Sequence, residues 1–342
     1  MDDLDTQVLR SALAWQQAGR RVLLVTVART WGSSPRPPGS LMALRDDGAT
    51  VGSVSGGCIE DALIEQVRQG ADLCEDGRPQ VVRYGISAEQ AHQFGLPCGG
   101  TVELVLERVG PHSGLAELLE RCQRRQACER VLDLGSGEVR LLPGQPGQVP
   151  VLDDTAMRVP FGPRHRLIVI GAGDLSRFLC SMALGLGFEV TVCDPREERH
   201  SGWDLAGVTL SREMPDDLVA RLRPDARTAV VAVTHDPKLD DLALIDALQS
   251  GAFYVGAIGS RAHAAQRRAR LAEHFGLSAA QLDALHGPAG LYIGSRTPAE
   301  IALSIMAEVV AARNGVLARS GASVAAGKGA LPSDALSDSC PV

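Results

Sequence analysis

The chain has 342 residues, of which 45% are hydrophobic, so it is long enough to form two domains that each bury a core. Its formal net charge is −7 with acidic and basic residues interspersed, which argues against a nucleic-acid-binding surface and favours small-molecule or protein partners. The eight cysteines are scattered and none forms a CxxC pair, which disfavours a disulfide framework or a zinc ribbon.

The first elements predict a small mixed α/β domain. Apolar residues at helical intervals predict an amphipathic helix over Asp5–Gln17, and a β-rich run follows at Arg21–Ala28. The next stretch, Arg29–Gly39, holds three prolines and predicts a loop, which is either a ligand surface with two arginines and a tryptophan or a rigid connector. Two short strands, Ser40–Leu44 and Thr50–Val54, then form a hairpin across an Asp-Gly turn.

Cys58 follows a glycine-rich turn that ends in Gly56 and Gly57, and the residues after it, Ile59–Val67, predict a helix. A cysteine at a helix N-terminus is exposed to amide dipoles that favour its thiolate, so Cys58 is the best candidate for a reactive cysteine. The alternative is a small buried residue packed where two glycines bring the backbone close.

A second glycine-flanked cysteine, Cys98, lies just before the alternating strand Thr101–Arg108. A short strand at Pro79–Tyr84 and a short helix at Ser87–Gln93 are predicted before it. Two such cysteines in one small domain suggest the hypothesis that Cys58 and Cys98 face one pocket.

The middle of the chain predicts an extension followed by a boundary. A helix is expected over Gly114–Cys128, a hairpin over Val131–Leu142, and a Pro- and Gly-rich boundary at Pro143–Gly162. Cys122 and Cys128 have no glycine-rich setting, so we interpret both as structural. The expected domains are an N-terminal domain over 1–110, an extension and linker over 111–162, a C-terminal domain over 163–315, and a disordered tail over 316–342.

The segment from Leu167 to Asp194 predicts a strand, a tight glycine turn, a helix and a second strand. The turn carries Gly171 and Gly173, but Ser176 stands at the third glycine position of a dinucleotide fingerprint, where Gly or Ala is expected. Asp194 closes the second strand, roughly 20 residues on, in the position of a ribose-binding acid. The amides after Gly173 would form a helix N-terminus suited to a phosphate.

Strands and helices continue to alternate, which predicts a Rossmann-like, doubly wound parallel sheet. The apolar strand Thr228–Thr234 ends at His235, and the strand Tyr254–Ile258 leads to Ser260 and Arg261. Ligands bind at the carboxyl ends of such strands, so these residues join the glycine turn and Asp194 as candidate site residues. A capping box at Thr297 predicts the start of a final apolar helix, Pro298–Arg313.

Together, several motifs resemble the XdhC/CoxI family of xanthine dehydrogenase accessory proteins. The motifs are Gly52–Glu60 (GSVSGGCIE), Leu96–Gly100 (LPCGG), Gly171–Gly173 (GAG), Thr234-His235, Gly256–Arg261 (GAIGSR) and Thr297–Ile301 (TPAEI). The likeness covers roughly residues 20–108 and 165–314.

The resemblance implies an α/β protein in which an N-terminal mixed α/β domain precedes a C-terminal Rossmann-like domain. It implies an accessory factor, not an enzyme, that binds molybdenum cofactor or its dinucleotide form, protects it during sulfuration and assists its insertion into a xanthine dehydrogenase-type molybdoenzyme. The implied partners include a cysteine desulfurase, and a homodimer is expected. The residues carried over as cofactor contacts are Cys58, Cys98, Gly56, Gly57, Gly171, Gly173, Asp194, His235, Ser260 and Arg261, with Cys58 and Cys98 able to touch the molybdenum.

Two other functions stay open. The glycine turn and Asp194 are compatible with an NAD(P)-dependent oxidoreductase, and Cys58 is compatible with a sulfurtransferase that works through a persulfide. The sequence opens with acidic residues and has no run of about 18 apolar residues, so we expect a cytoplasmic protein with no membrane partner.

Overall fold

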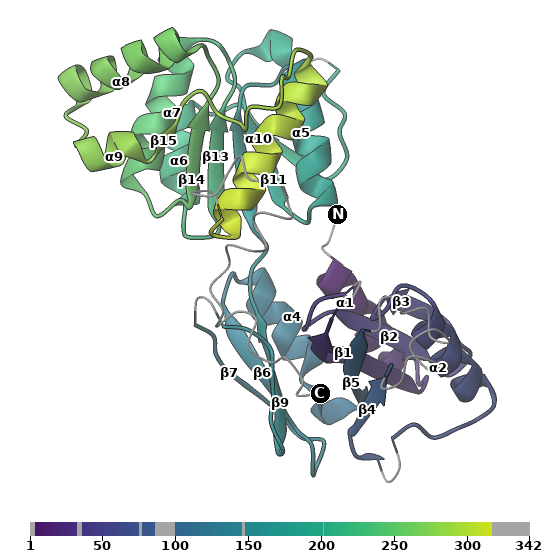
Figure 1. The fold of residues 1–342 in the computed structure, drawn as a ribbon. Coiled ribbons are helices and arrows are strands. Elements are labelled where there is room, and N and C mark those ends of the chain that lie inside the picture. The colour runs from purple at the N-terminus through teal and green to yellow at the C-terminus, as the bar shows by residue number, and fades with distance from the viewer. Residues whose placement is uncertain are drawn as a thin grey trace. The chain divides into compact units, whose positions relative to one another are not determined.

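A computed structural model describes residues 4–32, 36–74, 77–85, 100–145, 148–200 and 202–316 (Figure 1). The described chain forms two compact units that divide between Pro163 and Arg164. The predicted helix at Ser87–Gln93, the residue Cys98 and the predicted tail after Val316 lie outside the described residues. Within the described ranges, no helix is both long and apolar enough to cross a bilayer.

The N-terminal unit is built on a five-stranded antiparallel sheet with the order β3-β2-β1-β5-β4. Its strands are β1 (Val22–Trp31), β2 (Leu41–Arg45), β3 (Thr50–Gly52), β4 (Gln80–Tyr84) and β5 (Thr101–Arg108). Side chains alternate across β1, so Leu24 packs with helix α1 (Leu4–Gln17), whereas Val25 packs with helix α2 (Cys58–Arg68). The two helices therefore cover opposite faces of the sheet.

Strand β1 is longer than predicted, because Arg29, Thr30 and Trp31 continue it instead of opening the loop. Backbone pairing decides this: β1 stays in register with β5 as far as Trp31 opposite Thr101. The prolines that end the strand come later, so nothing in these three residues removes a backbone donor.

The rest of the N-terminal unit is a helix and a four-stranded sheet, and one prediction about it is wrong. Helix α4 (Leu115–Gln123) ends before Cys128, because Arg125 adopts a left-handed backbone with φ 59° and Cys128 opens a strand. The Pro- and Gly-rich stretch predicted as a boundary, Pro143–Gly162, precedes the division between the two units and also contains two strands. The later strand pairs with Cys128–Asp133 and with the earlier strand. The sheet has the order β7-β6-β9-β8, with a short 3-10 helix η2 (Pro111–Ser113) before α4 and strands β6 (Cys128–Asp133), β7 (Val139–Pro143), β8 (Val151–Leu152) and β9 (Ala156–Phe161).

The C-terminal unit is a six-stranded parallel sheet with the order β12-β11-β10-β13-β14-β15. Its strands are β10 (Arg166–Ile170), β11 (Glu189–Cys193), β12 (Val208–Ser211), β13 (Thr228–Ala232), β14 (Tyr254–Ala257) and β15 (Leu285–His286). Strands β10 and β13 are buried throughout, as expected for central parallel strands. This confirms the Rossmann-like prediction.

Helices cover both faces of this sheet (Figure 1). Helix α5 (Asp174–Gly185) packs with α10 (Pro298–Arg313) on one face, and α6 (Pro215–Leu222) packs with α7 (Pro237–Gln249) on the other. The remaining helices are η3 (Glu197–Arg199), α8 (Arg261–Phe275) and α9 (Ala279–Asp283). Sequence reasoning missed β12, α6, α9 and β15, all short elements whose patterns are too brief to show a period.

Candidate functional site

The loop between β3 and Cys58 is organised around one carboxylate, that of Glu60. Its Oε1 accepts hydrogen bonds from the Ser53 hydroxyl (2.7 Å) and from the amides of Val54 (2.9 Å), Ser55 (2.8 Å) and Gly56 (3.0 Å). Its Oε2 accepts one from the Gly57 amide (2.9 Å) and another from the Ser55 hydroxyl. The loop therefore wraps around a side chain of the helix that it introduces, and α2 begins directly after it at Cys58.

These contacts keep Glu60 ionised although it is only 9% exposed. Burial opposes ionisation, but the hydroxyl and amide donors outweigh it and hold the pKa of Glu60 well below its usual range. The amides of Gly56 and Gly57 are thus already committed to a carboxylate. Gly56 has φ 96°, a backbone conformation that favours glycine, so this position of the motif is explained by its turn.

The structure confirms that Cys58 stands at the start of a helix, whereas the surroundings of its side chain and all of Cys98 lie outside the description. The registers place the end of β3, the end of β4 and the start of β5 at one end of the sheet. There the Thr101 hydroxyl donates to the Gly85 carbonyl (3.1 Å). Cys58 comes shortly after β3 and Cys98 shortly before β5, so a shared pocket for the two cysteines stays a prediction that the topology allows.

Three other cysteines are unsuited to chemistry because they are buried. Burial raises the pKa of Cys74 to about 11 and the pKa of Cys180 and of Cys193 to about 12. These thiols stay protonated near neutral pH, which disfavours all three as reactive cysteines.

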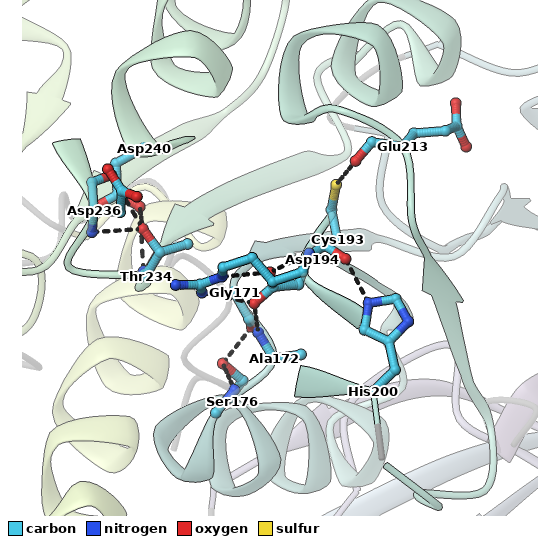
Figure 2. A network of polar contacts seen from close by, with 12 residues as sticks. Gly171, Ala172, Ser176, Cys193, Asp194, His200, Glu213, Thr234, Asp236 and Asp240 are labelled. Atoms are coloured by element: carbon cyan, nitrogen blue, oxygen red, sulfur yellow. Dashed lines mark hydrogen bonds and ion pairs between the residues drawn. The ribbon is translucent and has the colours of Figure 1, made fainter. Parts of the chain in front are cut away.

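The glycine turn after β10 is tightly packed against the loop after β13 (Figure 2). Gly171 has φ 112°, and a Cβ atom there would lie 3.0 Å from Cγ2 of Thr234. Ser176, at the third position of the fingerprint, is buried and donates a hydrogen bond from its hydroxyl to the Gly171 carbonyl (2.6 Å). The serine therefore braces the turn from within helix α5.

Asp194 follows β11, as predicted, but its carboxylate is completely buried and engaged (Figure 2). It accepts hydrogen bonds from the Ala172 amide (2.9 Å) and from the Arg196 guanidinium, whose Nε and Nη2 each lie 2.8 Å from one carboxylate oxygen. Burial opposes its ionisation, yet these donors outweigh it and lower the pKa of Asp194 below the usual value. Asp194 therefore ties the glycine turn to the loop after β11.

A histidine supports that loop from the other side. The Arg212 Nε donates to Nδ1 of His200 (3.0 Å), so Nε2 of His200 carries the proton that it shares with the Asp194 carbonyl oxygen (2.5 Å). The loop that holds Asp194 is thus fixed at both its side chain and its backbone.

His235 is exposed at the carboxyl end of β13 and adopts φ 63°, a backbone conformation that is uncommon outside glycine. The conformation is held by its neighbours: the Thr234 hydroxyl donates to Asp240 (2.7 Å) and accepts from the Asp236 amide (2.9 Å). Asp240 is itself buried and paired with Arg267 (3.0 Å). The network holds an exposed imidazole beside the glycine turn, at the point where strand order reverses.

Ser260 and Arg261 lie one strand further along, at the start of α8. The Ser260 hydroxyl accepts a hydrogen bond from the His263 amide (3.1 Å) and caps the helix, and the Arg261 side chain is exposed. Helix α5 has Gly173 as its N-cap, so no N-cap side chain binds its first-turn amides, and the helix begins at the same edge of the sheet. The structure thus brings Gly171, Gly173, Asp194 and His235 together and places Ser260 and Arg261 nearby.

Sequence reasoning missed the residues that support these turns. Glu60 has a sequence signal, because a glutamate three residues after a helix N-cap is half of a capping box. Ser176 appeared in the sequence only as a departure from the glycine fingerprint, and Arg196 and Asp240 belong to no recognisable motif. Across the described chain, no group of three or more His, Cys, Asp or Glu side chains is arranged to hold a metal ion.

Comparison with known proteins agrees with this architecture. The family profile described as the XdhC Rossmann domain matches residues 167–309, and the profile of the XdhC and CoxI family matches residues 15–85. The chain belongs to the XdhC and CoxI family. The resemblance inferred from the motifs is therefore confirmed.

Relatives of this family member cover most of its length. It is 28% identical over 306 residues to the molybdenum cofactor insertion chaperone PaoD of Escherichia coli, covering 90% of this chain and 88% of PaoD. It is 25% identical to a Bacillus subtilis protein named as a probable xanthine dehydrogenase subunit, covering 86% of this chain and 94% of that protein. A crystal structure described as a xanthine dehydrogenase from Bacillus halodurans shares the fold, with a TM-score of 0.73, 23% identity, and coverage of 98% of this chain and 100% of that one.

Proposed function

We propose that this chain binds a molybdenum cofactor as its cargo, shields the cofactor while a terminal sulfur ligand is installed, and passes it to a xanthine dehydrogenase-type molybdoenzyme. The observation that carries the proposal is the preorganised loop before Cys58, in which Glu60 fixes the backbone up to the residue before the cysteine. Similarity to a molybdenum cofactor insertion chaperone, with 28% identity over an alignment that covers 90% of the chain, supports it. The protein acts as a carrier and not as an enzyme.

The chemistry of the cargo suits the groups at the two candidate sites. Molybdenum and its dithiolene are soft, so thiolates of Cys58 and Cys98 are suitable contacts. The phosphate, or the pyrophosphate of a dinucleotide form, suits the uncapped N-terminus of α5 after Gly173 and the exposed Arg261. His235 would supply a directed hydrogen bond at the edge of the same sheet.

Sulfur would arrive from a cysteine desulfurase. In one route the Cys58 thiolate attacks the outer sulfur of the donor's persulfide, which forms the Cys58 persulfide and releases the donor cysteine as a thiolate. Mass spectrometry after incubation with the donor tests this step, since the absence of an added sulfur atom on Cys58 removes it. We also propose that the protein is cytoplasmic and forms a homodimer. Light scattering on the purified protein tests the dimer.

The alternative of an NAD(P)-dependent oxidoreductase is not favoured. A ribose-binding acid needs a carboxylate that faces the ligand, whereas the Asp194 carboxylate is buried and bound to Ala172 and Arg196. The relative with 28% identity is named as an insertion chaperone, which also supports a carrier.

The experiment measures the cofactor content of the protein after it is co-expressed with the enzymes of molybdenum cofactor biosynthesis and purified without oxygen. Molybdenum is measured by elemental analysis and pterin by fluorescence of its oxidised form. We expect both in near-equal amounts in the wild type, a loss in Cys58→Ala and Cys98→Ala, and no loss in Cys122→Ala as the matched control. Protein that lacks both molybdenum and pterin but binds NAD(P) tightly would overturn the proposal.

A further inference from the structure

Three charged side chains form a row across neighbouring strands of the N-terminal sheet. Strands β1, β5 and β4 lie side by side (Figure 1), and Arg29 of β1 and Arg83 of β4 both lie opposite Glu103 of β5. Nη1 of Arg29 lies 3.3 Å from Oε2 of Glu103, and Nε of Arg83 lies 2.8 Å from Oε1 of Glu103. The row is therefore fixed by strand register as well as by ion pairs.

A β-bulge puts Arg29 in this row. The register of β1 against β5 shifts between Val27, which lies opposite Leu104, and Arg29, which lies opposite Glu103. Without the extra residue, Arg29 would lie opposite Val102 on the other face of the sheet. Bulges commonly re-aim a side chain next to a functional site, so this irregularity is a second indication of function at the row.

The row carries excess positive charge near the surface. The Glu103 side chain is only 6% exposed, whereas the Arg29 and Arg83 side chains are 46% and 50% exposed. Two guanidinium groups thus share one buried carboxylate. Arg29 also donates to the Leu152 carbonyl, and over the described part of the chain most N–H groups of the two arginines have no other acceptor.

An aromatic side chain completes the cluster. The Arg83 guanidinium lies over the Trp31 ring, 5.0 Å from its centroid, and Trp31 is half-buried opposite Thr101 on the same face of the sheet. Guanidinium and indole are both planar, so the cluster offers surfaces on which a heterocycle can stack beside donors for an anion.

We propose that Arg29, Trp31 and Arg83 form a binding site for a phosphate or pyrophosphate group attached to a planar heterocycle. Guanidinium groups match phosphate oxygens with paired N–H donors, and Glu103 holds both arginines in place before the ligand arrives. The loop before Cys58 does not compete for this role, because its amides are bound by Glu60. That the ligand is the cofactor's phosphate rests on the proposed function, and it makes this cluster the alternative to the N-terminus of α5 and Arg261 as the contact for that phosphate. The phosphate site itself does not rest on the proposed function.

The test is calorimetric titration of the full-length chain, purified from cells that make no molybdenum cofactor, with pyrophosphate and with flavin mononucleotide. Riboflavin, the same ring without phosphate, is the ligand control. We expect flavin mononucleotide to bind at least about tenfold more tightly than riboflavin, and Arg29→Gln or Arg83→Gln to weaken both phosphate ligands about tenfold each. Trp31→Leu should weaken flavin mononucleotide and leave pyrophosphate unchanged.

The matched control is Arg124→Gln, which removes the same charge from an exposed arginine at the C-cap of α4. Absence of pyrophosphate binding in the wild type, or an equal loss in Arg124→Gln, would overturn the site. If a glutamine variant does not fold, Arg83→Lys keeps the charge and should still weaken binding several-fold, and unchanged affinity there overturns the site as well. If the wild type binds pyrophosphate but retains no cofactor, the proposed function is refuted and the phosphate site stands. If the wild type retains the cofactor but Arg29→Gln and Arg83→Gln bind pyrophosphate as tightly as the wild type does, the phosphate site is refuted and the proposed function stands.

Discussion

Replacing Glu60 with glutamine should release the loop that precedes Cys58. The side chain has nearly the same shape, but the amide keeps only one acceptor oxygen and turns an NH₂ group toward donors that need an acceptor. In the wild type, four backbone amides and two hydroxyls donate to the two carboxylate oxygens. The substitution therefore leaves several buried donors without a partner.

The magnitude follows from those contacts. A hydrogen bond to a charged group contributes about 1.5–3 kcal/mol, and the losses are not additive, so we expect about 3 kcal/mol in total for the loop. Hydrogen exchange of the amides of Val54–Gly57 measures this locally. Because about 1.4 kcal/mol corresponds to a factor of ten, their protection should fall about a hundredfold.

The effect of Glu60 should also depend on pH. Its pKa is lowered in the folded protein, so the stability that it contributes is present above the unfolded pKa of about 4.3 and is lost as pH falls toward the folded value. The difference in amide protection between wild type and Glu60→Gln should therefore narrow by about 1 kcal/mol between pH 7 and pH 3.5. Glu65→Gln, on an exposed position of the same helix, is the control. Equal protection in Glu60→Gln and Glu65→Gln would refute the reasoning.

Three further predictions concern the C-terminal unit. Asp194→Asn should lower the free energy of unfolding by about 2–3 kcal/mol at pH 7, because it leaves the Arg196 guanidinium without its ion partner. Since the pKa of Asp194 is lowered in the folded protein, this loss should shrink as the pH falls below about 4. A loss under about 0.5 kcal/mol at pH 7, measured by urea unfolding, would contradict the prediction. Gly171→Ala should cost at least about 1–3 kcal/mol through its positive φ and its approach to Thr234, and unchanged thermal unfolding would contradict it. His235→Gly should leave the free energy of unfolding unchanged or raise it by up to about 1 kcal/mol, because glycine adopts φ 63° without strain. Its cofactor content should fall, and full cofactor content would remove His235 from the site.

Much of the fold could be predicted because its signals are local. The apolar run at Leu167–Ile170, the turn at Gly171 and the capping box at Thr297 each announce an element from a few neighbouring residues, and the structure confirms all three. Predictions failed where pairing with a distant strand decided the outcome. Ala156–Phe161 is a strand because β6 lies beside it, and no period in its own residues indicates that partner.

The candidate site divides in the same way. Its glycines and the start of a helix at Cys58 were apparent from the sequence, because tight turns and helix starts need particular residues. Only the folded chain decided that Glu60 fills the first glycine loop and that Asp194 is bound to Ala172 and Arg196. The reason is physical: a carboxylate is available to a ligand or committed to the protein according to which donors surround it. The loop conformation that turns the nearby amides toward Glu60, and the approach of the Ala172 amide to Asp194, arise only when the chain folds.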